Sequence, residues 1–329
     1  SRPRPRAAGR RGPGRRPVTE RVPVPEVHAA TVLISSRDRP EMLAETVASV
    51  LAGKSVPSEL LVVDQSARPH EQLAQLGEVR GCAVRYLQSD SRGLSRARNI
   101  GLRAAANEVV VLIDDDMFVQ RDWLAALLAA MPADPLAVVT GRVLPAPDEG
   151  TGGEVPPAAL VTRATPAVYR GRQPTDVVAG ANVALHRATV LGLGGYDERL
   201  GAGTRFASAD DNDIGLRLLD AGCEVRHVPE AVVLHRAWRT RGRRMRMRWD
   251  YGRGKGAFYV KHMRRGDAYT RARMRADARR RVRLALAALP RSPQTAGAQS
   301  VYLAGMIAGA VEWQVREQAG RARRRAPPD

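Results

Sequence analysis

The chain has 329 residues, two cysteines and a formal net charge of +19 at pH 7. This length suits one large domain with an extension, and two cysteines exclude a disulfide framework, so we expect a reducing, cytoplasmic setting. The longest apolar candidate, residues 300–310, is far shorter than the roughly 20 residues that cross a bilayer. The basic N-terminus is not followed by the apolar segment of a secretory signal.

Positive charge is concentrated in the flanks. Residues 1–27 hold eight arginines against two acids, and residues 236–283 hold nineteen basic residues against three acidic ones, whereas residues 28–235 are mildly acidic. Nucleic acid, an anionic membrane surface, or a high arginine usage without any partner would each account for such flanks. Aromatic residues are scarce in the basic segments, which disfavours a stacking surface for nucleic acid. We therefore expect a membrane surface rather than nucleic acid as the partner.

Strands and helices are predicted to alternate from residue 29 onwards. Residues 1–27 are rich in Pro, Arg and Gly and are expected to be disordered. Apolar runs predict strands at 30–34, 60–63, 83–87 and 109–113, and helical spacing predicts helices at 41–51, 71–76 and 94–106. This short-range alternation indicates a doubly wound α/β unit with a mostly parallel sheet flanked by helices.

The second half of the chain is less regular. Strand-like segments lie at 177–185, 223–227 and 231–234, and a helix is predicted at 213–219. From residue 236 the chain becomes basic, with helices predicted at 267–289 and 300–318. We expect three parts: an arm at 1–27, an α/β domain at 28–238, and a basic, mostly helical extension at 239–329.

Acidic residues and one histidine stand at the boundaries of predicted elements. These are Asp64, Asp114, Asp115, Asp116, the run Asp210-Asp211-Asn212-Asp213 and His235. Taken alone, the triplet could be a solvated acidic turn before a helix capped by Asp122. Open α/β sheets bind ligands at the carboxyl ends of their strands, and hard cations are held there by carboxylates together with substrate phosphates. The combination therefore predicts a metal and ligand site.

Seven segments of the chain, in order, resemble the inverting glycosyltransferases of family 2, which have the GT-A nucleotide-sugar-binding fold. They are residues 32–40, 61–66, 93–101 (GLSRARNIG), 112–116 (LIDDD), 180–184 with 194–198, 210–218 (DDNDIGLRL) and 233–235. The resemblance covers about residues 29–265. It implies a Rossmann-like, mostly parallel sheet. It also implies metal-dependent transfer of a sugar from a nucleotide-diphosphate donor to an acceptor hydroxyl, in the synthesis of a cell-envelope polysaccharide, a glycolipid or a natural-product glycan.

The resemblance also implies roles for individual residues. Those on the donor side are Ser36, Arg37, Asp64, Arg96, Arg98, Asp114 and Asp115. The metal ligands are Asp114, Asp116 and His235, and the expected ion is Mn²⁺ or Mg²⁺. The acceptor-side residues are Asn182, Tyr196 and Trp238. Asp211 is the expected base, while Asp210, which stands where the family usually has Glu, is the expected ligand of the acceptor hydroxyl; the reverse order stays open.

These roles form a consistent chemistry. The metal ion acts as a Lewis acid on the departing nucleotide diphosphate. Asp64 accepts from a nucleobase N–H, and Arg96 or Arg98 balances phosphate charge near the start of a helix. Asp211 removes the proton of the acceptor hydroxyl. Attack from the face opposite the leaving group inverts the anomeric carbon.

Two other functions stay open at the level of sequence. A nucleotidylyltransferase on a related fold should carry a Gly-rich phosphate loop after its first strand, and the turn at residues 35–40 has no glycine. A catalytically dead core with flanks that bind nucleic acid would be expected to lose its acids, and all of them are present. The donor sugar, its base and the acceptor, which is a glycan, a lipid-linked glycan or a small molecule, depend on variable loops.

Overall fold

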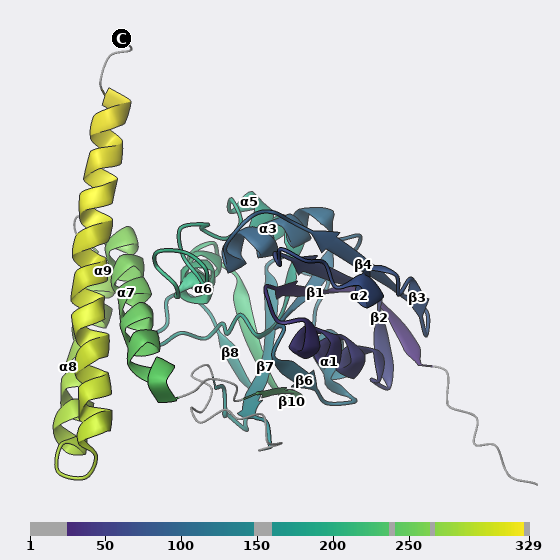
Figure 1. Ribbon diagram of the computed structural model, residues 1–329, viewed down its shortest axis with the longest axis horizontal. Coiled ribbons are helices and arrows are strands. Elements are labelled where there is room, and N and C mark those ends of the chain that lie inside the picture. Colours follow the sequence, from purple (N-terminus) through teal and green to yellow (C-terminus); the bar gives the residue numbers. More distant parts are fainter. Residues whose placement is uncertain (1–24, 148–159, 237–240, 264–266, 326–329) are drawn as a thin grey trace, which may run out of the picture.

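The computed structural model describes residues 25–147, 160–236, 241–263 and 267–325 (Figure 1). This part of the chain forms an α/β domain and a layer of helices at its C-terminal end. The first strand begins at Glu26, four residues before the predicted start. The rest of the arm predicted at 1–27, that is residues 1–24, lies outside the described residues.

Ten strands form one mixed sheet in the described part of the chain. They are β1 (Glu26–Ser36), β2 (Ser55–Asp64), β3 (Glu78–Val79), β4 (Cys82–Gln88), β5 (Val109–Asp114), β6 (Met117–Val119), β7 (Ala137–Pro145), β8 (Ala167–Tyr169), β9 (Asn182–His186) and β10 (Glu224–His235). Their order is β3-β4-β2-β1-β5-β9-β7-β10-β6, with β8 paired to β10. Parallel pairing joins β4, β2, β1 and β5, and also β7 with β10, which confirms the predicted α/β fold. The sequence did not predict that β9 would insert antiparallel between β5 and β7.

Helices cover both faces of the sheet. They are α1 (Pro40–Leu51), α2 (Glu71–Ala74), α3 (Leu94–Ala104), α4 (Trp123–Ala129), α5 (Arg187–Gly192) and α6 (Asp210–Asp220). The central strands contain continuous apolar runs, residues 32–34, 60–63 and 109–113, so successive side chains pack into a core on each face of the sheet. On one face Val32, Ile34, Val62, Val111 and Ile113 pack with Leu43 and Val47 of α1 and Leu124 and Leu127 of α4. On the other, Leu33, Leu61, Val63, Val110 and Leu112 pack with Leu102 of α3 and Ile214 and Leu218 of α6.

Several predicted boundaries differ from the structure. The two short strands expected at 223–227 and 231–234 form one strand, β10, whose register shifts between Val228 and Val232. The strand expected from residue 177 begins only at Asn182. Neither β7 nor the helix that starts at Arg244 was predicted.

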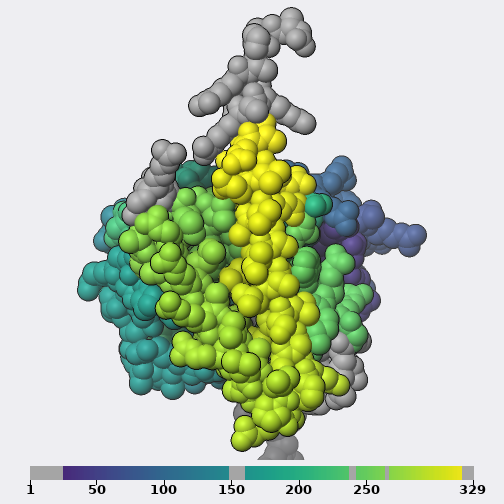
Figure 2. Space-filling view, turned by 90° about the vertical axis from the view of Figure 1, so that its left-hand side faces the viewer, coloured from purple at the N-terminus to yellow at the C-terminus, as the bar shows by residue number. Residues whose placement is uncertain are grey.

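Three helices make up the C-terminal layer: α7 (Arg244–His262), α8 (Ala268–Ala288) and α9 (Pro293–Arg325), preceded by a short 3₁₀ turn, η1 (Arg241–Arg243). In Figure 1, α7 lies between α6 and α9, and Figure 2 shows α8 and α9 over one side of the molecule. Leu216 of α6, Phe258 of α7 and Tyr302 of α9 share one apolar cluster. No helix in the described ranges is both long and apolar enough to span a membrane.

Glycines set the close approach of α7 to α9. A Cβ atom on Gly256 would collide with the backbone oxygen of Met306, and one on Gly309 with the backbone oxygen of Arg253. Gly252 and Gly305 make equivalent contacts one turn away. Because both helices place glycine four residues apart at the contact, their backbones touch directly, as in small-xxx-small helix pairs. The layer is thereby fixed against the α/β domain through α7.

Candidate active site

A cavity of about 900 Å³ opens at the carboxyl ends of β1 and β5. Nine of the residues predicted from the sequence line it: Ser36, Arg37, Arg98, Asp114, Asp115, Asp116, Asp210, Asp211 and His235. Helices α7 and α8 complete the wall with Arg248, Tyr251, Lys255, Tyr259, Arg273, Arg280 and Arg281. The C-terminal extension is therefore part of the site rather than a separate appendage.

The sheet brings the first of these groups together. β1 and β5 are parallel neighbours, with Ser35 opposite Asp114, so the two strand ends meet at one edge. Ser36 donates a hydrogen bond from its Oγ to Asp115 at 2.7 Å, and Arg39 binds the other oxygen of the same carboxylate at 2.7 Å. Asp115 therefore fastens the turn after β1 to the end of β5. Both of its oxygens are engaged in these bonds, and its contact with the donor stays a prediction.

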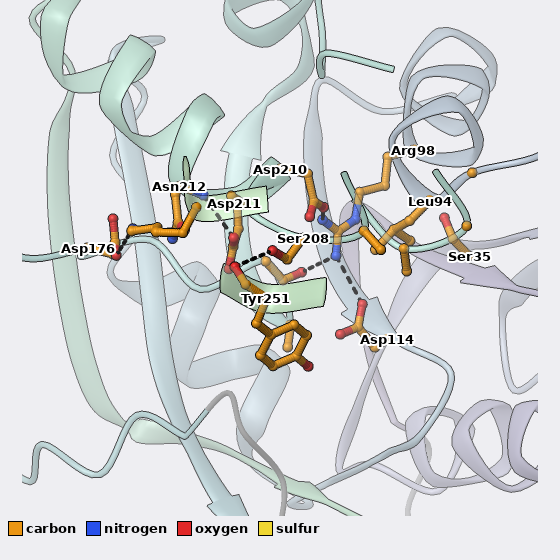
Figure 3. Close-up of a pocket in the computed structure, with 18 of the residues that line it drawn as sticks. Ser35, Leu94, Arg98, Asp114, Asp176, Ser208, Asp210, Asp211, Asn212 and Tyr251 are labelled. Carbon is orange, nitrogen blue, oxygen red and sulfur yellow. Dashed lines mark hydrogen bonds and ion pairs between the residues drawn. The ribbon is translucent and has the colours of Figure 1, made fainter. Parts of the chain in front are cut away.

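Arg98 of α3 connects three elements of the site (Figure 3). Its guanidinium donates to Oδ2 of Asp210 at 2.7 Å, to Oδ1 of Asp114 at 3.0 Å and to the backbone oxygen of Gly180 at 3.0 Å. Only 4% of its side chain is exposed. A buried guanidinium that binds three acceptors in fixed directions holds those acceptors in position relative to one another. Gly180 is needed here because a Cβ at that position would press on the guanidinium.

Asp116 and His235 are adjacent at the other side of the strand ends. β6 runs antiparallel to β10 with Met117 opposite His235, and the imidazole Nε2 lies 3.5 Å from Oδ2 of Asp116. A carboxylate and an imidazole are ligands that manganese accepts. Both side chains are buried.

The predicted third ligand does not join this pair. In the described part of the chain no three side chains of the His, Cys, Asp or Glu type are grouped to hold a metal ion. The reason is that Asp114 is turned toward Arg98, which holds its Oδ1 at 3.0 Å. We therefore correct the expected trio: the structure brings together Asp116 and His235, whose donor set fits a divalent ion that takes its remaining ligands from substrate phosphate.

The first turn of α6 carries two carboxylates in different environments. Asp210 is buried and forms an ion pair with Arg98. Asp211, in contrast, accepts a hydrogen bond at 2.8 Å from the backbone N–H of Asn212, and no ion pair within the described residues engages it. Burial raises the pKa of Asp211 to about 7, helped by repulsion from Asp210 and Asp176 and opposed by Arg98 and Lys255. Such a carboxylate is suited to accept a proton near neutral pH.

The backbone before α6 is held in an unusual conformation. Ala209 has φ of +70°, a left-handed value that costs a residue with a Cβ of order 1–2 kcal/mol. Ser208 donates a hydrogen bond at 3.1 Å to the backbone oxygen of Tyr251 in α7. Gly254 leaves room for this contact, because a Cβ there would meet the Ser208 Oγ. These contacts with helix α7 thus help to fix the positions of Asp210 and Asp211.

Two predicted donor-side residues lie outside the cavity wall. Asp64 ends β2, as predicted, but its carboxylate accepts hydrogen bonds from the Ser66 hydroxyl and from the Tyr86 hydroxyl, each at 2.5 Å. Arg96 forms an ion pair with Glu198 at 2.8 Å and points to the outside of α3. Of the two arginines considered for this helix, Arg98 is the one that reaches the site.

The structure places two of the three predicted acceptor-side residues away from the cavity wall. Asn182 is fully buried within the sheet, where it accepts from the indole N–H of Trp123 and donates to backbone oxygens of Arg142 and Ala231. Tyr196 is 2% exposed and packs in the apolar core, so its ring has no free face for a sugar. Trp238, the third of them, lies outside the described residues.

The sequence did not predict the residues that line the cavity on the side of Asp211 that faces away from the sheet. Asp176, in the segment before β9, binds Lys255 of α7 at 2.6 Å and also Arg273 of α8. Arg248 and Tyr251 of α7 line the same cavity. Residues 236–283 are rich in Arg and Lys, and this feature of the sequence is the signal that could have identified basic side chains in the cavity wall.

A family model described as glycosyl transferase family 2 matches residues 31–184, from β1 to the middle of β9. Residues 31–184 of the chain, 154 of 329, thus match this family of glycosyltransferases. The match ends before α6, so the assignment of Asp210 and Asp211 rests on the geometry of the site and not on the matched region.

Individual relatives agree with the family. The pre-mycofactocin glycosyltransferase of Mycobacterium tuberculosis is 29% identical over 221 residues, which cover 64% of this chain and 43% of that protein. The glucosyl-dolichyl phosphate glucuronosyltransferase of Haloferax volcanii is 26% identical over 223 residues, covering 65% and 70%. This chain thus spans less than half the length of the mycobacterial relative.

The fold is shared with a solved mannosyltransferase. PcManGT from Pyrobaculum calidifontis, solved in complex with GDP-Man and Mn²⁺, superposes with a TM-score of 0.58 over 87% of this chain and 86% of its own length. The sequence identity is 19%, so the comparison establishes the GT-A fold of the chain and leaves its substrates open.

Proposed function

We propose that this protein is a metal-dependent inverting glycosyltransferase that moves a sugar from a nucleotide-diphosphate donor to an acceptor hydroxyl. The acceptor is a glycan, a lipid-linked glycan or a small molecule. The observation that carries this proposal is the pair of carboxylates in the first turn of α6. Asp210 is neutralised by Arg98 at 2.7 Å, whereas Asp211 faces the same cavity with a pKa of about 7 and without such a partner.

The donor is proposed to lie against the sheet edge. Ser36, Arg37 and Asp114 line that end of the cavity, and the N-terminus of α3 faces it through Arg92 and Gly93. Helix N-termini and arginines bind phosphate groups, because both present N–H donors to anions. We keep Asp64 as the candidate contact of the nucleobase, with its carboxylate already oriented by Ser66 and Tyr86.

Asp116 and His235 are the proposed protein ligands of the divalent ion, manganese or magnesium. When bound there, the ion supplies Lewis acidity that neutralises the charge on the departing nucleotide diphosphate. Support comes from the Asp116–His235 distance of 3.5 Å and from PcManGT, the structural relative solved with Mn²⁺.

Asp211 acts as the base in this proposal. It accepts the proton of the acceptor hydroxyl while the hydroxyl oxygen forms a bond to the anomeric carbon and the bond to the nucleotide diphosphate breaks. Attack from the Asp211 side, opposite the donor diphosphate, inverts that carbon. Asp210 and Arg98 keep the base in position, since Asp210 precedes it in α6 and is bonded to α3.

The test is an Asp211→Asn variant measured with a panel of UDP- and GDP-sugars and manganese. We expect transfer to fall by about 10²-fold or more, the usual contribution of a general base, while donor binding in a thermal-shift assay stays near the wild-type value. Asp220→Asn, at the far end of the same helix, is the matched control. Undiminished transfer in Asp211→Asn would refute the assignment, and loss of donor binding would make Asp211 structural.

The two alternative functions predict different results in the same assay. A nucleotidylyltransferase would form pyrophosphate from a nucleotide triphosphate and a sugar phosphate. A catalytically dead protein would hydrolyse no nucleotide sugar and would bind DNA tightly in a salt-dependent way. No contact within the described residues favours either over glycosyl transfer, and the family match argues for transfer.

We also propose that the C-terminal helices contact an anionic membrane surface. Leu284, Leu286 and Leu289 are exposed near the turn between α8 and α9, beside the exposed Arg283. Apolar side chains next to basic ones match the chemistry of an anionic bilayer surface. Sedimentation with phosphatidylglycerol vesicles should decrease with salt and with Leu286→Gln/Leu289→Gln. The absence of salt-dependent sedimentation would end this proposal.

A further inference from the structure

The cavity continues beyond Asp211, away from the sheet. In Figure 3, Asp211 lies between Asp114 on one side and Asp176 on the other. Asp176 is bonded to Lys255 of α7 and to Arg273 of α8, so these helices form the wall on that far side. If the donor occupies the sheet edge, this second half is the space left for the acceptor.

The second half is rich in arginine and lysine, and several of these cations are already paired. Lys255 and Arg273 share the carboxylate of Asp176. Arg281 lies 3.9 Å above the ring of Tyr302, with its Nε 3.3 Å from Asp277. These contacts fix the positions of the side chains and explain why they are ordered without a ligand.

Arg248 and Arg280 differ from the rest of the wall. Both line the cavity, and neither has an ion pair with any residue in the described ranges. The Nε atom of Arg248 is buried and has no hydrogen-bond partner among these residues. A buried N–H of a charged group without an acceptor costs free energy, of order 1–3 kcal/mol or more. A well-solvated surface arginine would not have this property.

Neighbouring positive charges make the position of Arg248 still less favourable. Burial lowers its pKa, and repulsion from Arg281 and Arg244 lowers it further. Like charges so close together in a partly desolvated wall are stabilised when an anion lies between them.

We propose that this half of the cavity binds a phosphoryl group of the acceptor, with Arg248 and Arg280 as its ligands, so that the acceptor is a phosphate ester whose hydroxyl faces Asp211. The inference rests on the proposed glycosyl transfer, because that function places the donor at the other end. A phosphate monoester fits better than a carboxylate, since its oxygens accept from several guanidinium groups at once. Tyr251 and Tyr259 line the same space and provide surface for the carbon skeleton.

Binding of simple phosphate esters to the full chain tests the inference. Isothermal titration calorimetry would use geranyl phosphate, glucose 1-phosphate and, as the phosphate-free comparison, geraniol. UDP or GDP with manganese is present at saturation, so that the donor phosphate site is filled. We expect at least one ester to bind, and geraniol to bind at least about tenfold more weakly than geranyl phosphate. Geranyl phosphate has no alcohol hydroxyl and serves only as a probe of the phosphoryl and carbon-skeleton contacts. Tighter binding of geranyl phosphate than of glucose 1-phosphate would indicate an acceptor phosphate ester with a lipid skeleton, and the reverse one with a sugar skeleton.

Substitution of Arg248 and Arg280 tests whether these two residues bind the phosphate ester. Arg248→Gln/Arg280→Gln should weaken ester binding by about tenfold or more, while nucleotide binding stays unchanged and confirms that the variant is folded. Arg279→Gln is the matched control, because Arg279 adjoins Arg280 on α8 and is exposed like it but does not line the cavity.

The results separate this inference from the proposed function. Ester binding that survives in the double variant, or that disappears when nucleotide is added, overturns the inference. So does the absence of ester binding to a wild-type chain that binds nucleotide, and in that case the proposed function stands. A wild-type chain that binds esters through Arg248 and Arg280 but binds no nucleotide sugar would instead refute the proposed function.

Discussion

The Nη1 atom of Arg98 lies 2.7 Å from Oδ2 of Asp210, and this pair ties helix α3 to the first turn of α6. The same guanidinium holds Asp114 at the end of β5. The proposed donor edge of the sheet and the proposed base are therefore parts of one connected unit. The pair also separates two consecutive carboxylates chemically, since Asp210 is neutralised and Asp211 is not.

Replacing Arg98 should damage both stability and activity. Arg98→Ala leaves the buried Asp210 without its cation, which typically costs about 3–5 kcal/mol, and it releases Asp114. Arg98→Lys should recover part of the stability but not the activity, because a single ammonium cannot hold three acceptors in fixed directions. Urea unfolding and transfer rates measure the two effects. Adding Asp210→Asn to Arg98→Ala should restore part of the lost stability; no recovery would contradict the pairing.

The pH dependence of transfer should report Asp211. Because its pKa is about 7 and the base must be deprotonated, kcat/KM should rise with pH through that value and level off above it. A profile that is flat between pH 5 and 8, at saturating metal, would show that another group accepts the proton.

The Asp211 carboxyl should also make the stability of the folded chain depend on pH. A rise in pH should increase the rate of transfer but lower the stability. The folded pKa of this carboxyl is above its value in the unfolded chain, so the folded state holds the proton more tightly, and stability falls as pH rises from about 4 to about 7. Asp211→Asn removes this penalty. The melting temperature of the variant relative to wild type should therefore be higher at pH 8 than at pH 5, and an equal difference at both pH values would contradict the raised pKa.

His235 should determine how much metal the enzyme needs. His235→Ala removes one of two adjacent candidate ligands and should raise the manganese concentration for half-maximal transfer by about tenfold or more, since even outer-shell changes at metal sites cost 10–100-fold. Titration of manganese into chelator-treated protein measures this. His186→Gln, at the end of β9 and outside the cavity wall, is the control. An unchanged requirement in His235→Ala would remove this residue from the metal site.

The contact between α7 and α9 should tolerate no side chain. Gly309→Ala forces a methyl group into the backbone of Arg253 and should destabilise the chain by about 1–3 kcal/mol. Gly297→Ala, in the same helix, meets only a side-chain atom of Met245 at 3.7 Å and should instead stabilise it by roughly 0.5–1 kcal/mol. Equal effects of the two substitutions on thermal unfolding would show that the close contact is absent.

The sequence predicted best those features that depend on local pattern and parallel pairing. Apolar runs located the central strands, and the three aspartates could be placed at the carboxyl end of a predicted strand. Ser36 was assigned from the resemblance to the family, and Asp211 was chosen as the base because Asp210 stands where the family usually has Glu. Only the structure showed that Asp210 is paired with Arg98, a contact between residues 112 positions apart.

Two differences between sequence and structure have physical causes. Asn182 and Tyr196 stand in segments that resemble the family but do not line the cavity, because a resemblance does not reveal which way a side chain points. In the antiparallel β9 the Asn182 amide turns into the sheet, next to Trp123. Helix α7 was missed because it is packed through glycine and carries many arginines, so the apolar spacing that predicts helices is absent.

The glycine contact between α7 and α9 has a consequence for how this enzyme can change. Since the pairing of α7 with α9 depends on backbone touching backbone at Gly252, Gly256, Gly305 and Gly309, the side chains that α7 and α8 place in the cavity wall are not needed for this contact. Such side chains can be exchanged while α7 and α9 stay paired. In the proposed function, these exchanges would alter the acceptor side of the cavity and leave the donor side at the sheet edge as it is.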